Sequence, residues 1–274
     1  MQPHDQNADQ IAVALGGIAI EAGHLLRRLE RDVKDHRVKQ DGTPTTGADL
    51  AAEELIIGRL KTAWPGIPVV AEETANAVKP DRLFFLVDPL DGTGDYLHGT
   101  GEYSVNIALV DGARPIAAVV SAPALGRIWV AGTSVRSGEI VADQDEAVGW
   151  RPVNARAAAG RDLVALVSRR HGDAATETCL SSLAIGTRRM ASSALKFCII
   201  ASGEADVYVR CGPTMEWDTA AGDHILCRAG GSVIGPSGSA LTYGHDERGY
   251  RNGPFAALGD ASLAPLLSLP TVAA

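Results

Sequence analysis

The sequence predicts a layered α/β sandwich rather than a barrel. Amphipathic helical patterns and short apolar strands are spread along the whole chain, and they do not alternate strictly as they do in a barrel of repeated βα units. The 274 residues suit a single domain made of two closely joined lobes, roughly 1–145 and 146–274. Apolar residues make up 46% of the chain, which is enough for an ordinary core.

The first half of the chain is expected to supply two helices and several strands. Apolar residues over 9–30 recur at intervals of three and four, which predicts an amphipathic helix. A second helix is expected over 47–64, where a Pro-Gly pair follows. The uninterrupted apolar run 83–87 predicts a strand that is buried on both faces. Further strands are expected over 104–110, 115–121 and 127–131.

The second half begins after an acidic stretch, 138–151, which we expect to mark the boundary between the lobes. Strands are predicted over 163–167 and 206–210. Helices are predicted over 192–202 and 219–229, each of which is followed by glycine.

Composition argues against several classes of partner. The net charge of −8 repels phosphate backbones and anionic lipid, so nucleic acid is not expected as a partner. No apolar run reaches the roughly 18 residues of a membrane-spanning helix, and the polar N-terminus does not have the pattern of a signal peptide. We therefore expect a cytoplasmic protein, with peripheral association with the inner membrane left open. The four cysteines have no zinc-ligand spacing and are interpreted as inert thiols.

The hexapeptide D-P-L-D-G-T, which begins at Asp88, is the most informative segment. Asp88 and Asp91 can face one point at the end of the buried strand, where bound Mg²⁺ would relieve their mutual repulsion. The Leu90 carbonyl can serve as a further oxygen ligand. Gly92 allows its own amide and that of Thr93 to approach phosphate oxygens closely. The alternative is a polar loop in which the aspartates make turn hydrogen bonds.

Two further acidic positions extend this set. Glu72-Glu73 ends an apolar segment, and Asp218 lies in W-D-T-A-A-G at the start of a helix. Taken alone, Glu72 is an ordinary surface acid and Asp218 is a helix N-cap. Together with Asp88 and Asp91 they form an all-oxygen set that suits Mg²⁺ and does not suit zinc.

These motifs resemble those of the inositol monophosphatase family, which are lithium-sensitive, metal-dependent phosphatases. The family is recognised by E-E after a strand, D-P-[IL]-D-G-T and W-D-x-A-A-G, which occur here in that order at 72–73, 88–93 and 217–222. The stretch 43–49 resembles the family's segment that ends in T-x-x-D, and the likeness extends to about Gly231.

Within the family, the chain is most similar to the bacterial 3′(2′),5′-bisphosphate nucleotidases, through the stretches 101–109, 195–198 and 203–210. Inositol monophosphatases usually have an acid where Arg210 stands and no lysine at the position of Lys196. The resemblance implies that these two cations suit a second phosphate or an adenine edge. The alternatives are a solvated helix face for Lys196 and a surface ion pair for Arg210.

The resemblance implies a five-layered αβαβα sandwich of the inositol monophosphatase / fructose-1,6-bisphosphatase type, with the site between the two lobes. It also implies two or three Mg²⁺ ions, which clamp the phosphate, activate water and stabilise the leaving oxygen. The implied metal ligands are Glu72, Asp88, the Leu90 carbonyl, Asp91 and Asp218.

The resemblance also implies catalytic and substrate-binding roles. Glu72 and Thr93 would position the attacking water, with Thr93 oriented by Asp49, although Asp49 also fits a capping box with Thr46. The implied substrate-binding residues are Leu90, Asp91, Gly92, Thr93, Lys196, Arg210 and Asp218.

The implied reaction removes the 3′-phosphate of 3′-phosphoadenosine 5′-phosphate, giving AMP and phosphate, in sulfate assimilation or nucleotide salvage. The expected partner is this small nucleotide, and a homodimer is left open. The first alternative is an inositol-1-monophosphatase or another sugar (bis)phosphatase of the same fold. A second alternative, a phosphatase with an aspartyl nucleophile, would need D-x-D where this chain has D-x-x-D. A third, a non-catalytic nucleotide sensor, should have lost at least one metal ligand, but all the implied ligands are present in this chain.

Overall fold

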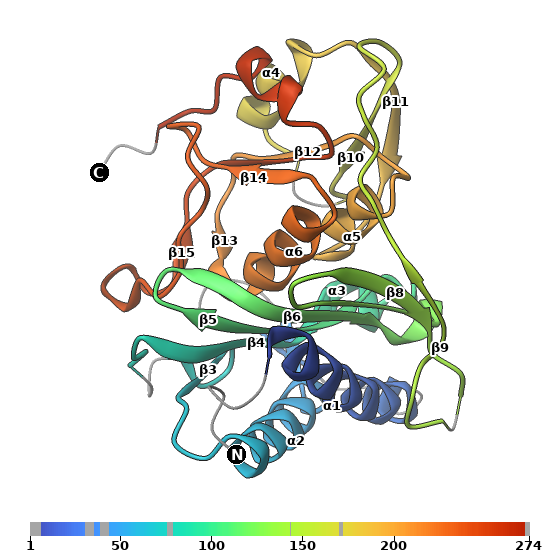
Figure 1. The fold of residues 1–274 in the computed structure, drawn as a ribbon, viewed down its shortest axis with the longest axis vertical. Helices are drawn as coiled ribbons and strands as arrows, with labels where there is room; N and C mark the ends of the chain where they lie inside the picture. Colours follow the sequence, from blue (N-terminus) through green and yellow to red (C-terminus); the bar gives the residue numbers. More distant parts are fainter. Residues whose placement is uncertain are drawn as a thin grey trace.

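A computed structural model describes residues 7–30, 36–38, 44–75, 79–142, 144–169 and 172–271, so Thr43 of the stretch 43–49 lies outside the described residues. Two sheets alternate with helices to give the expected αβαβα order of five layers (Figure 1). The outer helices α1 (Ala8–Leu29) and α2 (Gly47–Ala63) cover the first sheet. The helices α5 (Leu195–Ala201) and α6 (Glu216–Arg228) lie between the sheets, and α4 (Ala174–Ser181) lies beyond the second.

The first sheet has seven strands in the order β3-β4-β5-β6-β7-β8-β9, of which only β3 and β4 pair in parallel. Its strands are β3 (Val69–Ala71), β4 (Leu83–Asp91), β5 (Ser104–Asp111), β6 (Arg114–Ala122), β7 (Arg127–Ala131), β8 (Val135–Glu139) and β9 (Val148–Pro152). The strands expected over 83–87, 104–110, 115–121 and 127–131 are confirmed. β4 runs on through Asp91, so both aspartates of the hexapeptide lie within the strand. The acidic stretch 138–151 contributes to β8 and β9.

The second sheet has five strands in the order β11-β10-β12-β16-β14. They are β10 (Leu163–Val167), β11 (Ile185–Met190), β12 (Val207–Arg210), β14 (Ser232–Ile234) and β16 (Phe255–Leu258). The strands predicted over 163–167 and 206–210 are confirmed, and the division into two lobes near residue 145 stays a prediction. The remaining elements are the ribbon β1 (His36–Val38) with β2 (Pro44–Thr46), the ribbon β13 (Thr214–Met215) with β15 (Arg251–Asn252), α3 (Thr93–Leu97), and the 3₁₀ turns η4 (Pro123–Leu125), η5 (Asp246–Arg248) and η6 (Ala261–Leu266).

Two predicted helices begin at other residues than expected. α5 begins at Leu195 instead of 192, and Ser193 just before it has a left-handed φ of 59° that a helix does not allow. α6 begins at Glu216 instead of 219, which places Asp218 inside the first turn and not at the N-cap.

Close packing of the two central helices fixes where α6 presents its first turn. A Cβ atom added at Gly222 would lie 2.5 Å from Cδ2 of Phe197 on α5, so a glycine is needed where the helices touch. Ala220, Ala221 and Ile225 on α6 are buried among the surrounding apolar side chains. The glycine of W-D-T-A-A-G is therefore a packing residue, and it positions Asp218.

Candidate active site

A β-bulge in β4 turns both aspartates of the hexapeptide to one side. In a regular strand, residues three apart point to opposite faces of the sheet. Here Asp88 pairs with Asn106 and Asp91 with Ser104, so two residues of β4 stand opposite Val105 alone. Because Asn106 and Ser104 share a face of β5, their partners Asp88 and Asp91 also share one.

The carboxylate of Asp91 is held from both halves of the chain. Its Oδ2 accepts hydrogen bonds from Asn106 Nδ2 at 3.1 Å and from the amide of Ala194 at 2.7 Å. Nearby, Ser192 Oγ donates to Asp95 Oδ2 at 2.8 Å, which adds a second polar link between the segment before α5 and the segment after β4. These bonds fix the orientation of Asp91.

Gly92 lies where these two segments meet. Its φ of 93° is in the left-handed region, and an added Cβ would lie 2.6 Å from Ser193 Oγ and 3.2 Å from the Glu102 carbonyl oxygen. Only glycine fits this position without displacing a neighbour. Thr93 follows as the first residue of α3.

Asp218 and Glu72 bring two more carboxylates to the same cleft. Asp218 Oδ2 accepts a hydrogen bond from the Met215 amide at 2.8 Å, which ties this side chain to the N-terminus of α6. Glu72 follows β3, and its amide donates to the Val87 carbonyl at 3.1 Å. Its neighbour Glu73 faces elsewhere, where it accepts a hydrogen bond from Thr45 Oγ1 at 3.1 Å. Of the acid pair, Glu72 lines the cleft.

The carboxylates repel one another. Asp88 is 1% exposed, and burial first, then the charges of Glu72, Asp91 and Asp218, raise its pKa well above the ordinary value. The pKa of Asp218 is also raised, by burial and then by Asp91 and Glu72. Burial raises the pKa of Asp91 too, although hydrogen bonds from Ala194 and Ser193 oppose the shift. A bound divalent cation would remove this repulsion.

Asp49 performs both of the roles that the sequence allowed. Its Oδ2 accepts from the Thr46 amide at 2.7 Å and from Thr46 Oγ1 at 2.6 Å, which caps α2. Its Oδ1 accepts from Thr93 Oγ1 at 3.0 Å, while that hydroxyl also lies 3.2 Å from the Leu90 carbonyl oxygen. Burial is the first cause of a raised pKa at Asp49. The cap on α2 thus also orients Thr93.

The predicted cations form another part of the wall of this cleft, which has a volume of about 900 Å³. Lys196 is buried; its Nζ donates to the Ala191 carbonyl at 3.2 Å and lies 4.7 Å from the ring centroid of Tyr208. Burial lowers the pKa of Lys196 to about 8. Arg210 donates from Nη2 to the Pro213 carbonyl at 2.9 Å, and its charge opposes the raised pKa of Asp218. Lys196 therefore does not lie on a solvated helix face, and Arg210 is half-buried and forms no ion pair with the residues that the structure describes.

All predicted metal ligands and substrate-binding residues therefore line one cleft between the two sheets, and Asp49 lies directly behind Thr93. The model of the inositol monophosphatase family matches residues 7–263. The chain belongs to this family.

Several relatives in the family carry a more specific name. The 3′(2′),5′-bisphosphate nucleotidase CysQ of Escherichia coli strain K12 is 37% identical over 208 residues, which cover 75% of this chain and 81% of that protein. The CysQ of Salmonella typhimurium is 36% identical, over 82% of this chain and 91% of that protein. The crystal structure of CysQ from Bacteroides thetaiotaomicron superposes with a TM-score of 0.75 at 33% identity and covers 91% of this chain and 97% of that one. An inositol monophosphatase of Thermotoga maritima, at 21% identity and a TM-score of 0.74, supports the fold alone.

Members of the inositol monophosphatase family are generally Mg²⁺-dependent, and the donor set of this chain fits that cation. The donors are carboxylate and carbonyl oxygens, which suit a hard cation, and the repulsion at Asp88 and Asp218 calls for positive charge. In the described part of the chain, no three His, Cys, Asp or Glu side chains converge as a closed ligand set.

Sequence reasoning missed several residues of the site. Asn106 and the Ala194 amide hold Asp91, but no local motif marks them, because Asn106 meets the aspartate only when β4 pairs with β5, and Ala194 only when the segment before α5 packs against β4. The cleft is also lined by Arg169 and Arg251, which the sequence did not single out. A search for isolated arginines near turns in the second half of the chain would have found both residues, but it would also have found many arginines that do not line the site.

Proposed function

We propose that this protein hydrolyses the 3′-phosphate of 3′-phosphoadenosine 5′-phosphate, with AMP and phosphate as products. The observation that carries the proposal is that an acidic wall able to hold Mg²⁺ and a wall with Lys196 and Arg210 face the same cleft. The names of the CysQ relatives at 36–37% identity support the same substrate class.

The acidic wall, which is formed by Glu72, Asp88, Asp91 and Asp218, would bind the scissile phosphate through Mg²⁺. Glu72, Asp88, the Leu90 carbonyl, Asp91 and Asp218 are the proposed holders of Mg²⁺. Mg²⁺, when bound, supplies positive charge that clamps the phosphate, activates water and stabilises the leaving oxygen.

The attacking water is proposed to lie against Glu72 and the Thr93 hydroxyl. Asp49 Oδ1 accepts the proton of that hydroxyl at 3.0 Å, so the lone pairs of Thr93 Oγ1 are turned away from Asp49 and can accept a hydrogen bond from water. The amides of Gly92 and Thr93 follow the left-handed turn and are proposed to donate to phosphate oxygens.

The cationic wall, which contains Lys196 and Arg210, is proposed to bind the rest of the nucleotide. Lys196 is buried beside the ring of Tyr208, and Arg210 carries a planar guanidinium that suits a phosphate or the edge of a base. Inositol phosphate has no second phosphate and no base, so these two residues argue for a nucleotide.

No helix within the described residues is long and apolar enough to cross a membrane. The cytoplasmic location, the homodimer and the number of Mg²⁺ ions, two or three, stay predictions of the sequence.

The test is phosphate release in the presence of Mg²⁺ from 3′-phosphoadenosine 5′-phosphate, its sulfated relative 3′-phosphoadenosine 5′-phosphosulfate, inositol 1-phosphate and fructose 1,6-bisphosphate. We expect kcat/KM to be highest for the two nucleotides. A preference for inositol 1-phosphate or fructose 1,6-bisphosphate would replace the proposed substrate with the sugar phosphate alternative and leave the phosphatase chemistry in place.

A further inference from the structure

A loop near the end of the chain, residues 241–252 (called the strap below), forms part of the cleft wall. It contributes Gly249 and Arg251 to the lining. It ends in β15, which pairs antiparallel with β13, so that Arg251 stands opposite Met215 and Asn252 opposite Thr214. The strap therefore adjoins the segment that leads into Asp218.

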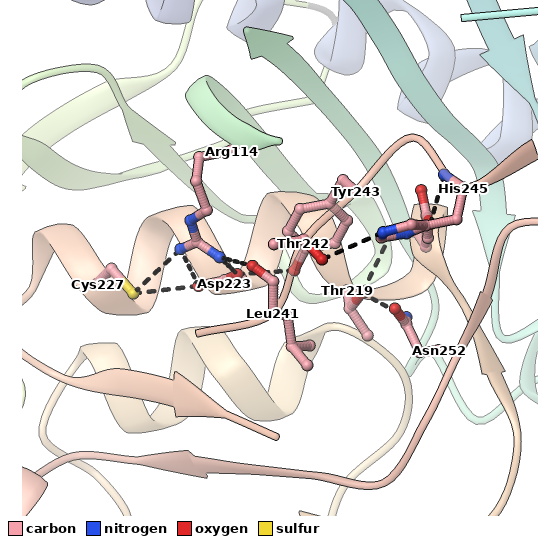
Figure 2. Close-up of polar contacts among 10 residues, drawn as sticks. Arg114, Thr219, Asp223, Cys227, Leu241, Thr242, Tyr243, His245 and Asn252 are labelled. Atoms are coloured by element: carbon pink, nitrogen blue, oxygen red, sulfur yellow. Dashed lines mark hydrogen bonds and ion pairs between the residues drawn. The ribbon is translucent and has the colours of Figure 1, made fainter. Parts of the chain in front are cut away.

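Buried polar groups on α6 anchor the strap at one end. Glu216, whose side chain is fully buried, accepts hydrogen bonds from the amides of Gly244 at 2.5 Å and His245 at 3.1 Å, and it lies 2.6 Å from His245 Nδ1. Tyr243 Oη donates to Asp223 Oδ2 at 2.7 Å (Figure 2). These bonds hold the strap against the same helix that presents Asp218.

The other end of the strap is anchored as firmly. Asn252 Nδ2 donates to Thr219 Oγ1 and to the Met215 carbonyl, each at 2.8 Å (Figure 2 shows the first of these). The Glu216 amide donates to the Tyr250 carbonyl at 2.8 Å. Because its neighbours on both sides are fixed, Arg251 is presented at the cleft from a rigid backbone.

Arg251 differs from the other cations of the cleft in how its charge is balanced. Arg169 forms an ion pair with Glu102 at 2.5 Å, Arg210 donates to backbone carbonyls, and Lys196 is buried beside Tyr208. Arg251 is exposed, and the described residues give its guanidinium no hydrogen bond or ion pair. It is the cleft cation most available to an anionic ligand.

Burial separates Arg251 from the acidic wall. Asp88 is 1% exposed and Lys196 is 3% exposed, and both lie deep in the cleft. There the scissile phosphate would meet the carboxylates and the Mg²⁺ ions that they would hold. Arg251 stands at the exposed rim and would meet the part of a substrate that stays toward solvent. A nucleoside bisphosphate places its second phosphate on the far side of the ribose from the scissile one.

We propose that Arg251 is a specificity-determining residue that binds the 5′-phosphate of a nucleoside 3′,5′-bisphosphate, the phosphate that is not cleaved. This proposal rests on the function proposed above. The guanidinium would donate two parallel hydrogen bonds to the phosphate, held in place by the strap and not by the substrate.

The experiment compares wild type with Arg251→Gln on two nucleotides that differ only in the 5′-phosphate, 3′-phosphoadenosine 5′-phosphate and 3′-AMP. We expect KM for the bisphosphate to rise about tenfold or more with kcat nearly unchanged, and both constants for 3′-AMP to stay level. Competitive inhibition by AMP, which keeps the 5′-phosphate, should weaken by a similar factor, while inhibition by adenosine should not change. Arg251→Lys should recover part of the loss.

Arg248→Gln is the matched control, because Arg248 lies on the same strap, pairs with Glu247 in solvent and does not line the cleft. It should leave all four constants unchanged, and neither variant should shift the melting temperature. Equal losses on the bisphosphate and 3′-AMP, or no change in inhibition by AMP, would overturn the role of Arg251 while the proposed function stands. A wild-type enzyme that prefers inositol 1-phosphate to the bisphosphate would instead overturn the proposed function.

Discussion

The acidic wall of the cleft and its cationic wall are built in different ways. Three of the four acids, Glu72, Asp88 and Asp91, come from the ends of two adjacent strands, β3 and β4, and are buried or half-buried. The cations Lys196 and Arg251 come from a helix and a ribbon in the second half of the chain, and range from fully buried to exposed. Most of the proposed metal ligands thus lie in one short neighbourhood, whereas the residues proposed to select the substrate come from segments that only folding brings together.

The two walls also differ in their energetics. The acids raise one another's pKa and are stable as a group only when protons or cations offset their charge. Each cation has its own contact with carbonyls, a ring face or solvent, although Lys196 and Arg210 also act to lower the pKa of Asp91 and of Asp218, respectively. Changes on the acidic wall should therefore affect all substrates equally, and changes on the cationic wall should distinguish between them. The predictions below test this contrast.

Removal of the metal should have the largest effect, since it leaves the acidic wall uncompensated. We expect turnover of every substrate to vanish in EDTA and to return with Mg²⁺, and to fall in Li⁺ at roughly millimolar concentration, because lithium sensitivity is typical of the inositol monophosphatase family. Mg²⁺ at a hundred times its Kd should also increase the free energy of unfolding by about 2.7 kcal/mol, and the melting temperature should rise accordingly. Undiminished turnover in EDTA would rule out this mechanism.

Asp91→Asn should lower kcat by about a thousandfold or more on nucleotide and inositol phosphate alike, because a proposed metal ligand supplies several kcal/mol of transition-state stabilisation. The fold should persist, since removing one buried charge relieves repulsion on Asp88 and Asp218. The control is Asp111→Asn. Asp111 forms an ion pair with Arg82 at the end of the β4–β5 pair that is farther from Asp91, so this variant should keep wild-type activity. Retention of most of the wild-type kcat at saturating Mg²⁺ would contradict the role of Asp91.

Arg210→Glu should separate the two substrates. Losing a charge-assisted hydrogen bond costs roughly 1.5–3 kcal/mol, which corresponds to a ten- to hundredfold loss of kcat/KM on the bisphosphate, and reversing the charge should cost more. Turnover of inositol 1-phosphate, which has neither a second phosphate nor a base, should stay level or rise. The measurement is kcat/KM for both substrates in wild type and variant. Equal losses would mean that Arg210 supports the fold or the acidic wall.

Lys196→Met should have the smallest effect on turnover, about a tenfold loss of kcat/KM on the bisphosphate at pH 7. The pKa of Lys196 falls from its ordinary 10.5 to about 8 because the ammonium is buried, with Asp91, Arg210, Glu102 and Asp95 as its charged surroundings. In the wild type, KM for the bisphosphate should therefore rise as pH passes 8 and the ammonium loses its proton. The variant should lack this step in its pH profile.

The same shift predicts an opposite effect of Lys196→Met on stability. Below pH 8 the folded protein carries a buried charge, so the variant should melt at a higher temperature than the wild type at pH 7. Between pH 8 and 10.5 the folded lysine releases its proton while the unfolded one keeps it, so wild-type stability rises and the gain from the variant shrinks. A variant that melts lower at pH 7 would show that Lys196 is a net stabilising contact.

Features that depend on neighbours along the chain could be predicted from the amino-acid sequence alone. The apolar run 83–87 had to be a buried strand, and the capping box from Thr46 to Asp49 fixed the start of α2. The motifs around Asp88 and Asp218 were enough to identify the family and the acidic wall. These features can be predicted locally because hydrophobic periodicity and capping act over a few residues.

Contacts between side chains that are distant in the sequence depend on how the strands and helices pack. The spacing of Asp88 and Asp91 would turn them to opposite faces of a regular strand, and it is the pairing of β4 with β5 that inserts the bulge and aligns them. The Ala194 amide reaches Asp91 across 103 positions of the chain, and Arg251 reaches the cleft because Glu216 and Asn252 fasten the strap to α6. No local pattern encodes such contacts, because their partners become neighbours only when the two sheets close on the helices between them.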